Sequence, residues 1–567
     1  MPHGARRHDP DYPRMGASGR RAMSEDRWHA EDGWPSRGGG RSPRGSGMPQ
    51  GRYRQPSRPA RAGGRWRGKS GLAKVGYIGA TLVAVVAMVV GIGGYAEYRH
   101  LEGNVTTVKV GDLSGRTVYG ALNILVLGSQ QRAGQKGYFG VAQGDSPLTS
   151  NSDNLLLIHL DPTHTHATIL SIPRDLFVYE PACKDRSRFI GIGTFPAQTY
   201  PPGNLIDGAL NIGGPTCAVA TTTDLTGIKL DHFVEFDFNS FRTMVDAIGG
   251  VQVCVPKGGY HDRKSHINLR AGRWTLTYTQ ALDYVRTRDS LGGPDAGGDL
   301  PRIEIQQSFI SSIVQKVNKQ GLFNNSLQLL SLANTATKAL TVDQGLGSVN
   351  ELLSLAKSLV HLKSSNVSLL TLPTTIDTYD YPKYDQHLMA VQPQDDVLYQ
   401  LIRTGQTWQG HLPVQPYSKV SIKVLNGTQD SGLARRTAAS LRRLGFTVVG
   451  TGDTAATTKT TVDFAGLTQA DGAYTVMTAL KSFPAGQNTL AEPAWQVGTP
   501  GPVTLILGTD FAGVNPPAAP KSATTNARGG RRHHRGANSG GGNQNSSGQV
   551  QSRNAGTNIC RGLPRHA

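Results

Sequence analysis

The sequence predicts an α/β protein with two folded domains, and three observations support this. Between residues 118 and 408, short apolar runs typical of buried strands are mixed with segments of helical periodicity. A smaller set of strand and helix signals occupies 419–514 and follows a linker that contains Pro and Gln. The total length of 567 residues is sufficient for two or more domains.

The first apolar runs predict the central strands of the larger domain. They are NILVLGS at 123–129, NLLLIHLD at 154–161 and ATILSIPRD at 167–175. Because these runs are almost continuously apolar, we expect strands that are buried on both faces. HFVEFDF at 232–238 alternates instead, with Val234, Phe236 and Phe238 expected on one face.

Helical signals follow these strands. FRTMVDAIGG at 241–250 predicts a short helix closed by glycine, and VQVCV at 251–255 predicts another strand. From Pro301, a longer helix is indicated by an apolar stripe at helical spacing that includes Ile303 and Ile310. Strands mixed with helices in this way favour a layered α/β domain.

The second region, 419–514, predicts a small α+β domain. VSIKVLNGT at 420–428 indicates a strand that ends in an Asn-Gly turn. SGLARRTAASLRRLGF at 431–446 indicates a helix closed by a glycine, and VTLILGTDF at 503–511 indicates a late strand.

The net charge of +19 belongs to the two tails. Residues 1–74 carry +11 and residues 515–567 carry +8, so that 75–514 is neutral. We therefore expect no nucleic acid among the partners of the folded part. Residues 1–70 and 515–567 are poor in apolar residues, which predicts that both are disordered basic tails.

Residues 75–95 form an uncharged stretch whose composition predicts a single transmembrane helix. The basic flank on its N-terminal side predicts that tail 1–70 is cytoplasmic and that the folded domains lie outside the cell membrane. An oxidising exterior permits disulfides, and Cys183 with Cys217 is the pair that we prefer, although sequence alone does not fix the connectivity.

Charged and amide side chains gather at the ends of the predicted strands and helices. Arg286 and Arg288 lie two apart in DYVRTRDS, and Arg174 and Asp175 follow a buried strand. The remaining candidates are Asp153, Asp299, Arg302, Gln306 and Gln307. Several arginines together favour a phosphate or pyrophosphate ligand, and carboxylates beside it favour Mg²⁺.

Each of these residues also has a plainer explanation when it is considered alone. Arg286 and Arg288 could be a solvated or salt-bridged pair. Asp153 could be a turn residue, and a buried glutamine at 306 or 307 could be a satisfied amide of the core.

The motifs occur in an order that resembles the LytR-CpsA-Psr (LCP) family. They are NILVLGSQQR, SDNLLLIHLD, SIPRD, DHFVEFDFNSFRTMVDAIGGVQVCVP, QALDYVRTRDS and GDLPRIEIQQSF. The resemblance implies a three-layer α/β/α LCP domain at 118–408, with its core at 118–320. VLNGT, SGLA and LGTDF resemble the LytR C-terminal domain, which implies that domain at 419–514.

The resemblance also implies a function. Members of this family transfer a glycopolymer from an undecaprenyl-pyrophosphate carrier to peptidoglycan and leave a phosphodiester link. The implied chain is a membrane-anchored extracytoplasmic phosphotransferase, a ligase-type enzyme whose partners are the lipid-linked glycopolymer, peptidoglycan and membrane lipid. The alternatives are a lipid-pyrophosphate phosphatase and a non-catalytic scaffold that binds wall polymer or lipid.

The family's functional residues carry over position by position. The resemblance implies that Arg174 and Asp175 are catalytic and that Asp153 binds Mg²⁺. The implied pyrophosphate-binding residues are Arg132, Arg286, Arg288, Arg302, Gln306 and Gln307, with Asp299 in the same motif as Arg302.

Three positions depart from the family pattern. Gln130 stands where a second metal-binding aspartate is expected, Asn151 replaces an arginine, and Asp207 ends Leu-Ile-Asp where Lys-Ile-Asn is common. Because glutamine is a neutral and weaker ligand for Mg²⁺, either Asp207 or Asp175 could supply the missing carboxylate.

Overall fold

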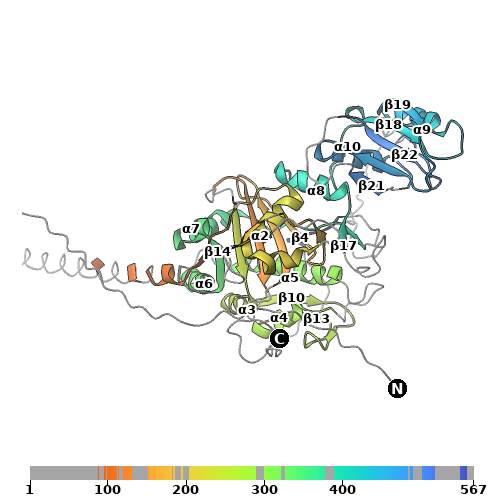
Figure 1. Ribbon diagram of the computed structural model, residues 1–567. Helices are drawn as coiled ribbons and strands as arrows, with labels where there is room; N and C mark the ends of the chain where they lie inside the picture. The colour runs from red at the N-terminus through yellow and green to blue at the C-terminus, as the bar shows by residue number, and fades with distance from the viewer. Residues whose placement is uncertain are drawn as a thin grey trace, which may run out of the picture. The chain divides into compact units, whose positions relative to one another are not determined.

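A computed structural model gives the arrangement of the folded part (Figure 1). Apart from isolated helical residues at 87–88 and 95–96, the residues that it describes are 99–111, 113, 119–129, 151–181, 183–185, 193–195, 204–288, 299–320, 326–376, 388–482, 485–488, 501–517 and 550–557.

The larger domain is built on one mixed sheet of eight strands. In spatial order the strands are β1 (Thr106–Val108), β14 (Leu340–Asp343), β9 (His232–Phe236), β2 (Leu122–Ser129), β3 (Ser152–Leu160), β4 (Ala167–Ile172), β15 (Val367–Thr371) and β23 (Gln551–Asn554). In its centre, β2 is parallel to β9 and antiparallel to β3, β3 is antiparallel to β4, and β4 is parallel to β15.

Helices and short hairpins surround this sheet. The helices are η1 (Ile206–Gly208), α2 (Ala209–Thr226), α3 (Phe238–Ala247), α4 (Tyr278–Val285), α5 (Asp299–Gln320), α6 (Ser326–Ala339), η3 (Gln344–Leu346), α7 (Val349–Ser358), η4 (Leu359–His361), η5 (Ser364–Asn366) and α8 (Gln394–Arg403). The two-stranded antiparallel sheets are β5 (Phe177–Val178) with β8 (Asn204–Leu205), β6 (Cys183–Asp185) with β7 (Gly193–Phe195), β10 (Val251–Val255) with β13 (Gly272–Leu276), β11 (Tyr260–Asp262) with β12 (Ile267–Leu269), and β16 (Thr374–Ile376) with β17 (Leu388–Ala390).

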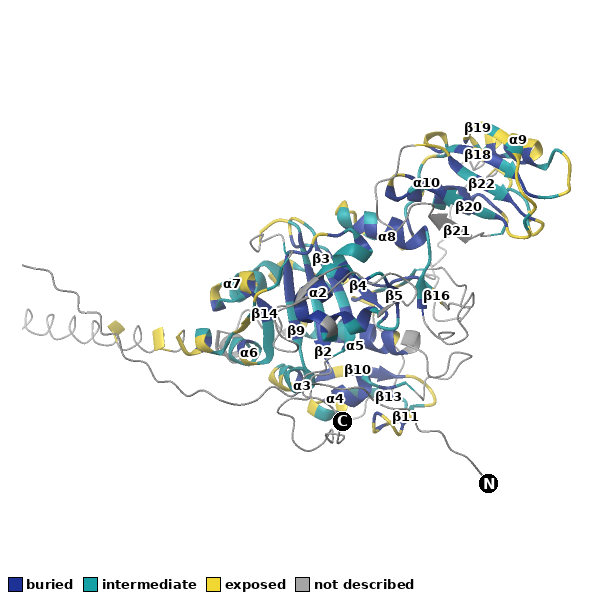
Figure 2. Cartoon of the chain, in the orientation of Figure 1, coloured by how far each residue is buried: buried dark blue, intermediate teal, exposed yellow. Residues whose placement is uncertain are grey.

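Both faces of the sheet are buried, as the apolar runs predict (Figure 2). Alternate residues of β2 enter two different cores, because successive side chains of a strand point to opposite faces. Leu125 and Leu127 pack with Leu210 and Val219 of α2. Leu122, Ile124 and Val126 belong to the core that includes side chains of α5 and α7. The domain therefore has helices on both faces of a mixed α/β sheet.

Helix α5 lies between the sheet and a further layer. Ile310 and Val314 pack in the core beneath the sheet, whereas Ile305 and Phe309 pack with β10, β13 and α4. Lys316 donates hydrogen bonds of 2.6 Å to the carbonyl oxygens of Gly249 and Gly250, directly before β10. The helix is thus held from both sides.

The strands and helices that the sequence predicts in the larger domain are all present in the structure. β10 has the predicted bounds, and β2 begins one residue before the predicted run. β9 ends two residues early because Asp237 caps α3, accepting a hydrogen bond of 2.7 Å from the Ser240 N–H. Phe233 and Glu235 of β9 are buried and Val234 and Phe236 are partly buried, whereas Phe238, which was predicted on the face of Val234 and Phe236, begins α3.

Two strands of the large sheet lie outside the predicted domain bounds of 118–408. β1 precedes the predicted domain boundary at 118, and β23 lies in the tail 515–567 that the composition predicts to be disordered. That expectation is wrong for Gln551–Asn554, which pairs with β15. Composition misses both strands because they are short and largely polar, and backbone hydrogen bonds to a sheet edge require no apolar pattern.

The C-terminal domain has a five-stranded sheet in the order β19-β18-β22-β20-β21, with two helices. Its elements are η6 (Tyr417–Lys419), β18 (Ser421–Asn426), α9 (Leu433–Leu444), β19 (Thr447–Asp453), β20 (Thr461–Phe464), α10 (Leu467–Thr478), β21 (Ala485–Asn488) and β22 (Val503–Leu507). The predicted strand, helix and late strand correspond to β18, α9 and β22.

In the described part of the chain, no helix is both long enough and apolar enough to cross a bilayer. The predicted span at 75–95 lies almost wholly outside that part, as does the side chain of Cys183. Cys217 forms a disulfide, and its helix α2 contacts β6, which begins at Cys183. The pairing of Cys183 with Cys217 stays a prediction that this contact favours.

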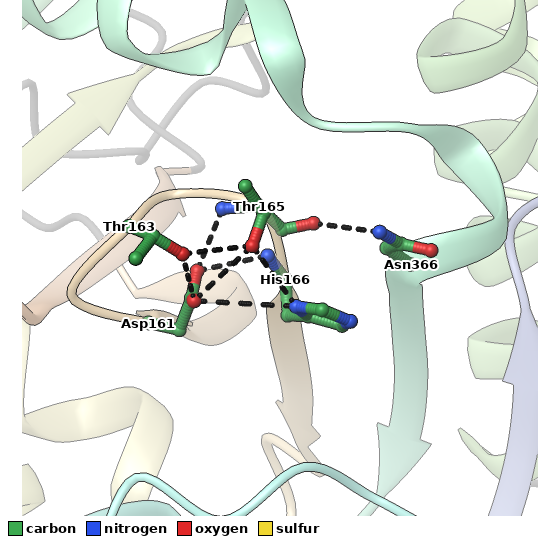
Figure 3. Close-up of polar contacts among 5 residues, drawn as sticks. All are labelled: Asp161, Thr163, Thr165, His166 and Asn366. Carbon is green, nitrogen blue, oxygen red and sulfur yellow. Dashed lines mark hydrogen bonds and ion pairs between the residues drawn. The ribbon is translucent and has the colours of Figure 1, made fainter.

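The turn between β3 and β4 is organised by Asp161 (Figure 3). One carboxylate oxygen accepts hydrogen bonds from the backbone N–H groups of Thr165, at 2.7 Å, and His166, at 2.8 Å. The other accepts one from the Thr163 hydroxyl at 2.5 Å. Asn366 then donates to the Thr165 carbonyl at 3.0 Å, which ties the turn to the start of β15.

Asp161→Asn should lower the free energy of unfolding at pH 7 by about 1–3 kcal/mol, because hydrogen bonds to a charged acceptor are lost. Burial opposes ionisation of Asp161, but the bonds from Thr163, His166 and Thr165 outweigh it and lower the pKa below 3.8. The wild-type protein is therefore more stable than Asp161→Asn above the pKa that Asp161 has in the unfolded chain. This difference in the free energy of unfolding is lost as the pH falls through the lower pKa of the folded state.

Urea unfolding at pH 7 and at pH 3 measures this difference. Asp246→Asn is the matched control, because Asp246 is an exposed aspartate of α3. If Asp161→Asn and the control lower the free energy of unfolding equally at pH 7, Asp161 does not stabilise the turn as proposed.

Candidate functional site

The predicted site residues of the first two motifs meet at one edge of the sheet. β3 begins at Ser152 and runs antiparallel to β4, with Leu155 opposite Ile172. Asp153, near the start of β3, and Arg174, just after the end of β4, are therefore at the same edge. This is a frequent position for ligand sites in α/β proteins.

Arg174 is the central cation of this edge. Its Nη1 lies 2.7 Å from Oδ1 of Asp153, and its Nε lies 3.3 Å from Oδ1 of Asp175. The side chains of all three residues are partly buried, with exposed fractions of 16%, 22% and 32% for Arg174, Asp153 and Asp175. Two carboxylates thus hold one guanidinium group in place, by charge-assisted contacts.

A third carboxylate, Asp207, joins them from η1. Its backbone N–H donates to the carbonyl oxygen of Arg174 at 3.3 Å, and its side chain is buried. Its Oδ2 accepts a hydrogen bond of 3.2 Å from the amide of Asn151. Two of the three positions that depart from the family pattern are therefore in direct contact.

The environment of Asp207 favours its neutral form. Burial, the main cause, raises the pKa of Asp207 to about 6, while the charge of Arg174 acts in the opposite direction. The negative charges of Asp175 and Asp153 raise it further, and the hydrogen bond from Asn151 lowers it. A carboxyl group of this kind changes its protonation close to neutral pH.

Arg286 and Arg288 lie at the end of α4 and not on an extended strand. Arg286 has helical backbone angles, and its guanidinium stacks 5.2 Å from the ring centroid of Phe238. The backbone N–H of Arg288 donates to Oδ2 of Asp262 at 2.7 Å. Thr287 between them is fully buried, whereas both arginines are partly buried. Arg286 and Arg288 therefore flank a helix end, which the buried Thr287 fixes through its hydrogen bond to the Asp283 carbonyl.

Gln306 and Gln307 both point inward, as the apolar stripe predicts, and both are buried. The amide of Gln306 donates to the Val285 carbonyl at 3.2 Å, next to Arg286. The amide of Gln307 donates to the Thr371 hydroxyl at 2.9 Å and lies 3.5 Å from that of Ser171. Their amide groups thus act as satisfied amides of the core, which was the plainer explanation of these two residues.

These two glutamines connect the parts of the site. Ser171 lies in β4, three residues before Arg174, and Val285 directly precedes Arg286. Adjacent residues of α5 therefore fix the end of β4 and the end of α4 to one helix. Sequence spacing shows that an amide faces inward, but it does not show which carbonyl or hydroxyl that amide reaches.

Of the other predicted site residues, Arg302 is buried, and the side chains of the rest lie outside the described part of the chain. Arg302 is buried, with 4% of its surface exposed. Asp299 is the first residue of α5, and its side chain is outside the described part. Gln130 and Arg132 also lie outside it.

The carboxylates that are described do not by themselves make a metal site. Within the described residues, no three His, Cys, Asp or Glu side chains are arranged so that they could hold a metal ion. Asp153, the predicted Mg²⁺ ligand, is instead bound to Arg174. Mg²⁺ therefore stays a prediction from the family resemblance.

Comparisons with known proteins address the whole chain. Residues 94–396 match the family model LytR_cpsA_psr, and residues 419–511 match the model described as LytR cell envelope-related transcriptional attenuator. The first match contains all the site residues described above.

Three individual proteins illustrate the similarity. The cell wall biosynthesis protein LcpA of Corynebacterium glutamicum is 29% identical over 65% of this chain and 75% of its own length. The polyisoprenyl-teichoic acid–peptidoglycan teichoic acid transferase TagU of Oceanobacillus iheyensis is 27% identical over 40% of this chain and 60% of its own. A LytR-Csp2A-Psr enzyme structure from Actinomyces oris covers 54% of this chain and 97% of its own, at 20% identity and a TM-score of 0.39.

The family assignment depends on the sequence matches and not on that structural likeness. The first model alone spans more than half of the chain, and the second follows it directly in the order that the motifs predict. The chain belongs to the LytR-CpsA-Psr family and carries a LytR C-terminal domain.

Proposed function

We propose that this protein is a membrane-anchored, extracytoplasmic phosphotransferase that attaches a glycopolymer from an undecaprenyl-pyrophosphate carrier to peptidoglycan. The observation that supports the proposal is the cluster around Arg174, in which a guanidinium group lies among carboxylates at strand ends, where ligands of α/β proteins frequently bind. The names of the relatives LcpA and TagU, a cell wall biosynthesis protein and a teichoic acid transferase, support the same class of reaction.

In the proposed step, a hydroxyl oxygen of peptidoglycan attacks the phosphorus that is linked to the sugar. The bond from that phosphorus to the bridging oxygen breaks, and polyprenyl phosphate leaves with the electron pair. Negative charge grows on the leaving phosphate, so a fixed cation there lowers the barrier. Arg174 has this role in the proposal, and Arg286 and Arg288 bind the remaining phosphate oxygens.

The hydroxyl also has to lose a proton, and we assign its acceptor to Asp207. The sequence names Asp175 as a candidate base, but Asp175 is already engaged by Arg174. Asp207 is bound by the neutral amide of Asn151, and its pKa of about 6 suits proton exchange near neutral pH.

Mg²⁺ belongs to the proposal through the family resemblance alone. When bound, it would supply positive charge to the phosphate oxygens. Asp153 is the described residue that would hold it, and no step above depends on it.

Gln130→Asp should strengthen Mg²⁺ binding, measured by calorimetry, if residue 130 faces the metal; unchanged binding would show that it does not.

The reaction is tested with the purified full chain, a lipid-pyrophosphate-linked glycan and peptidoglycan fragments. Glycan joined to peptidoglycan through a phosphodiester is the expected product. Free phosphorylated glycan would identify a lipid-pyrophosphate phosphatase. Binding without turnover would identify a scaffold and overturn the transferase.

Arg286→Ala and Arg288→Ala should each weaken binding of a lipid pyrophosphate by about 10- to 100-fold, because each removes charge-assisted hydrogen bonds. Binding to the full chain is measured by fluorescence anisotropy with a labelled lipid. Arg270→Ala is the matched control, since Arg270 is an exposed arginine of the same domain. Unchanged binding by both variants would exclude the arginines from the site.

Asp207→Asn should raise the free energy of unfolding above pH 6 by about 2–3 kcal/mol, because a buried carboxylate with a raised pKa is replaced by a neutral amide. Between pH 3.8 and about 6 the native wild-type protein holds a proton that the unfolded chain releases. The gain should therefore appear as the pH rises through this window and be absent below it.

Urea unfolding from pH 3.5 to 8 measures the effect, with Asp246→Asn as an exposed control. An equal difference between wild type and Asp207→Asn at pH 3.5 and pH 8 would contradict the proposed environment of this carboxyl. The measurement does not depend on any enzymatic activity.

A further inference from the structure

The end of the chain returns to the larger domain. β23 pairs antiparallel with β15, from Ser368 opposite Asn554 to Thr371 opposite Gln551. The next residue, Ala555, is fully buried, and its backbone N–H donates to the Val367 carbonyl at 2.9 Å. Neither family model reaches this segment, since the matches end at 396 and 511.

Side chains of α5 hold the same segment. The Ser311 hydroxyl and the Gln315 amide both donate to the Ala555 carbonyl, at 2.8 and 2.6 Å, and the Gln315 amide also reaches the Thr557 carbonyl at 3.2 Å. Asn554 donates to the Ser365 carbonyl, before β15, at 2.6 Å. The segment therefore joins the last paired strand to the helix beneath the sheet.

The segment also approaches the layer that contains β10. Burial raises the pKa of Tyr260 to about 12, and the positive charge of Arg553 opposes that shift. Tyr260 belongs to β11 and packs in the core formed by β10, β13 and α4. Lys316, next to the residue that binds the tail, holds the carbonyls of Gly249 and Gly250 before β10.

The cysteines complete the argument. Cys217 and Cys254 each form a disulfide. They do not form it with each other, because α2 covers one face of the sheet whereas β10 packs against α5 on the other. The contact of α2 with β6 favours Cys183 as the partner of Cys217. Among the four cysteines of the chain, Cys560 is then left for Cys254.

We propose that residues 550–557 are an integral strap of the larger domain, in which β23 is the eighth strand of the sheet, and that a disulfide between Cys254 and Cys560 locks this strap. The five residues after Ala555 can span up to about 17 Å, and α5, which holds Ala555, packs directly against β10. Forming the bond removes two protons and two electrons from the two thiols, and an extracytoplasmic thiol–disulfide oxidant accepts the electrons.

The strap has two consequences for the domain. It covers the backbone groups of β15 that would otherwise form an open edge, a hazard for aggregation. It also ties Ala555 and Thr557 to α5, whose Gln306 and Gln307 contact Val285 in α4 and Ser171 in β4. The proposal does not depend on the proposed transferase reaction.

Peptide mapping of the full chain under non-reducing conditions tests the disulfide. The expected result is one peptide pair that joins Cys254 to Cys560 and separates on reduction. Cys560 recovered as a free thiol, or joined to Cys183 or Cys217, would overturn the lock.

Two truncations separate the strand from the disulfide. Ending the chain after residue 557 removes Cys560 and keeps β23, whereas ending it after residue 549 removes both. The first should lower the Tm by about 5–15 °C and leave the amides of β15 protected from hydrogen exchange. The second should lower the Tm further and expose those amides; unchanged protection after the second truncation would overturn the strand.

A point variant tests the strand in a chain of full length. Ala555→Glu places a charge at a fully buried position, and it should abolish protection of the β15 amides in hydrogen exchange. Ser552→Glu is the control, because Ser552 is exposed in the same strand. Equal exchange in the two variants would contradict the seating of the strap.

Discussion

The position of α5 is the constraint on which the larger domain depends. One side of this helix buries Ile310 and Val314 beneath the sheet, and the other buries Ile305 and Phe309 against the layer of β10, β13 and α4. A helix confined in this way cannot shift without disrupting two cores, because protein interiors are close-packed. The side chains of α5 that contact the site, Gln306 and Gln307, are therefore held in place as well.

The amides of Gln306 and Gln307 use this rigidity. A buried amide without a partner costs free energy, so each side chain requires the Val285 carbonyl or the Thr371 hydroxyl to stay within reach. Gln306 thereby positions the segment that carries Arg286, and the 3.5 Å contact of Gln307 with Ser171 positions the strand that precedes Arg174. The two glutamines act here by positioning the site, whatever else they contact.

A strand could be predicted from the sequence only where its residues form a visible apolar pattern. β2 and β4 are apolar on both faces, so their runs are visible without any tertiary information. Phe238 was predicted in the strand with Val234 and Phe236, but it begins α3 because Asp237 caps that helix. β1 and β23 carry almost no apolar signal, because their positions depend on edge hydrogen bonds that a distant strand supplies.

The same reasoning applies to the site. Spacing identified Asp153 and Arg174 separately, and the antiparallel pairing of β3 with β4 brings them into contact. Asn151 and Asp207 each looked like an isolated departure from the family pattern, and no local signal indicates that they touch. Contacts between residues 56 positions apart depend on the tertiary fold, which a local pattern does not encode.

The balance of charge around Arg174 limits how any phosphate can bind there. Arg174 lies beside the carboxylates of Asp153 and Asp175, and burial raises the pKa of the neighbouring Asp207 to about 6. A pyrophosphate brings further negative charge, so a bare cluster of three ionised carboxylates would repel it. In the proposed step Asp207 takes up the proton of the attacking hydroxyl, which removes one of those charges without moving any chain segment. The family pattern has an arginine at position 151 and an asparagine at position 207. This chain has Asn151 and Asp207 instead, so the charge at these two positions depends on whether Asp207 holds a proton.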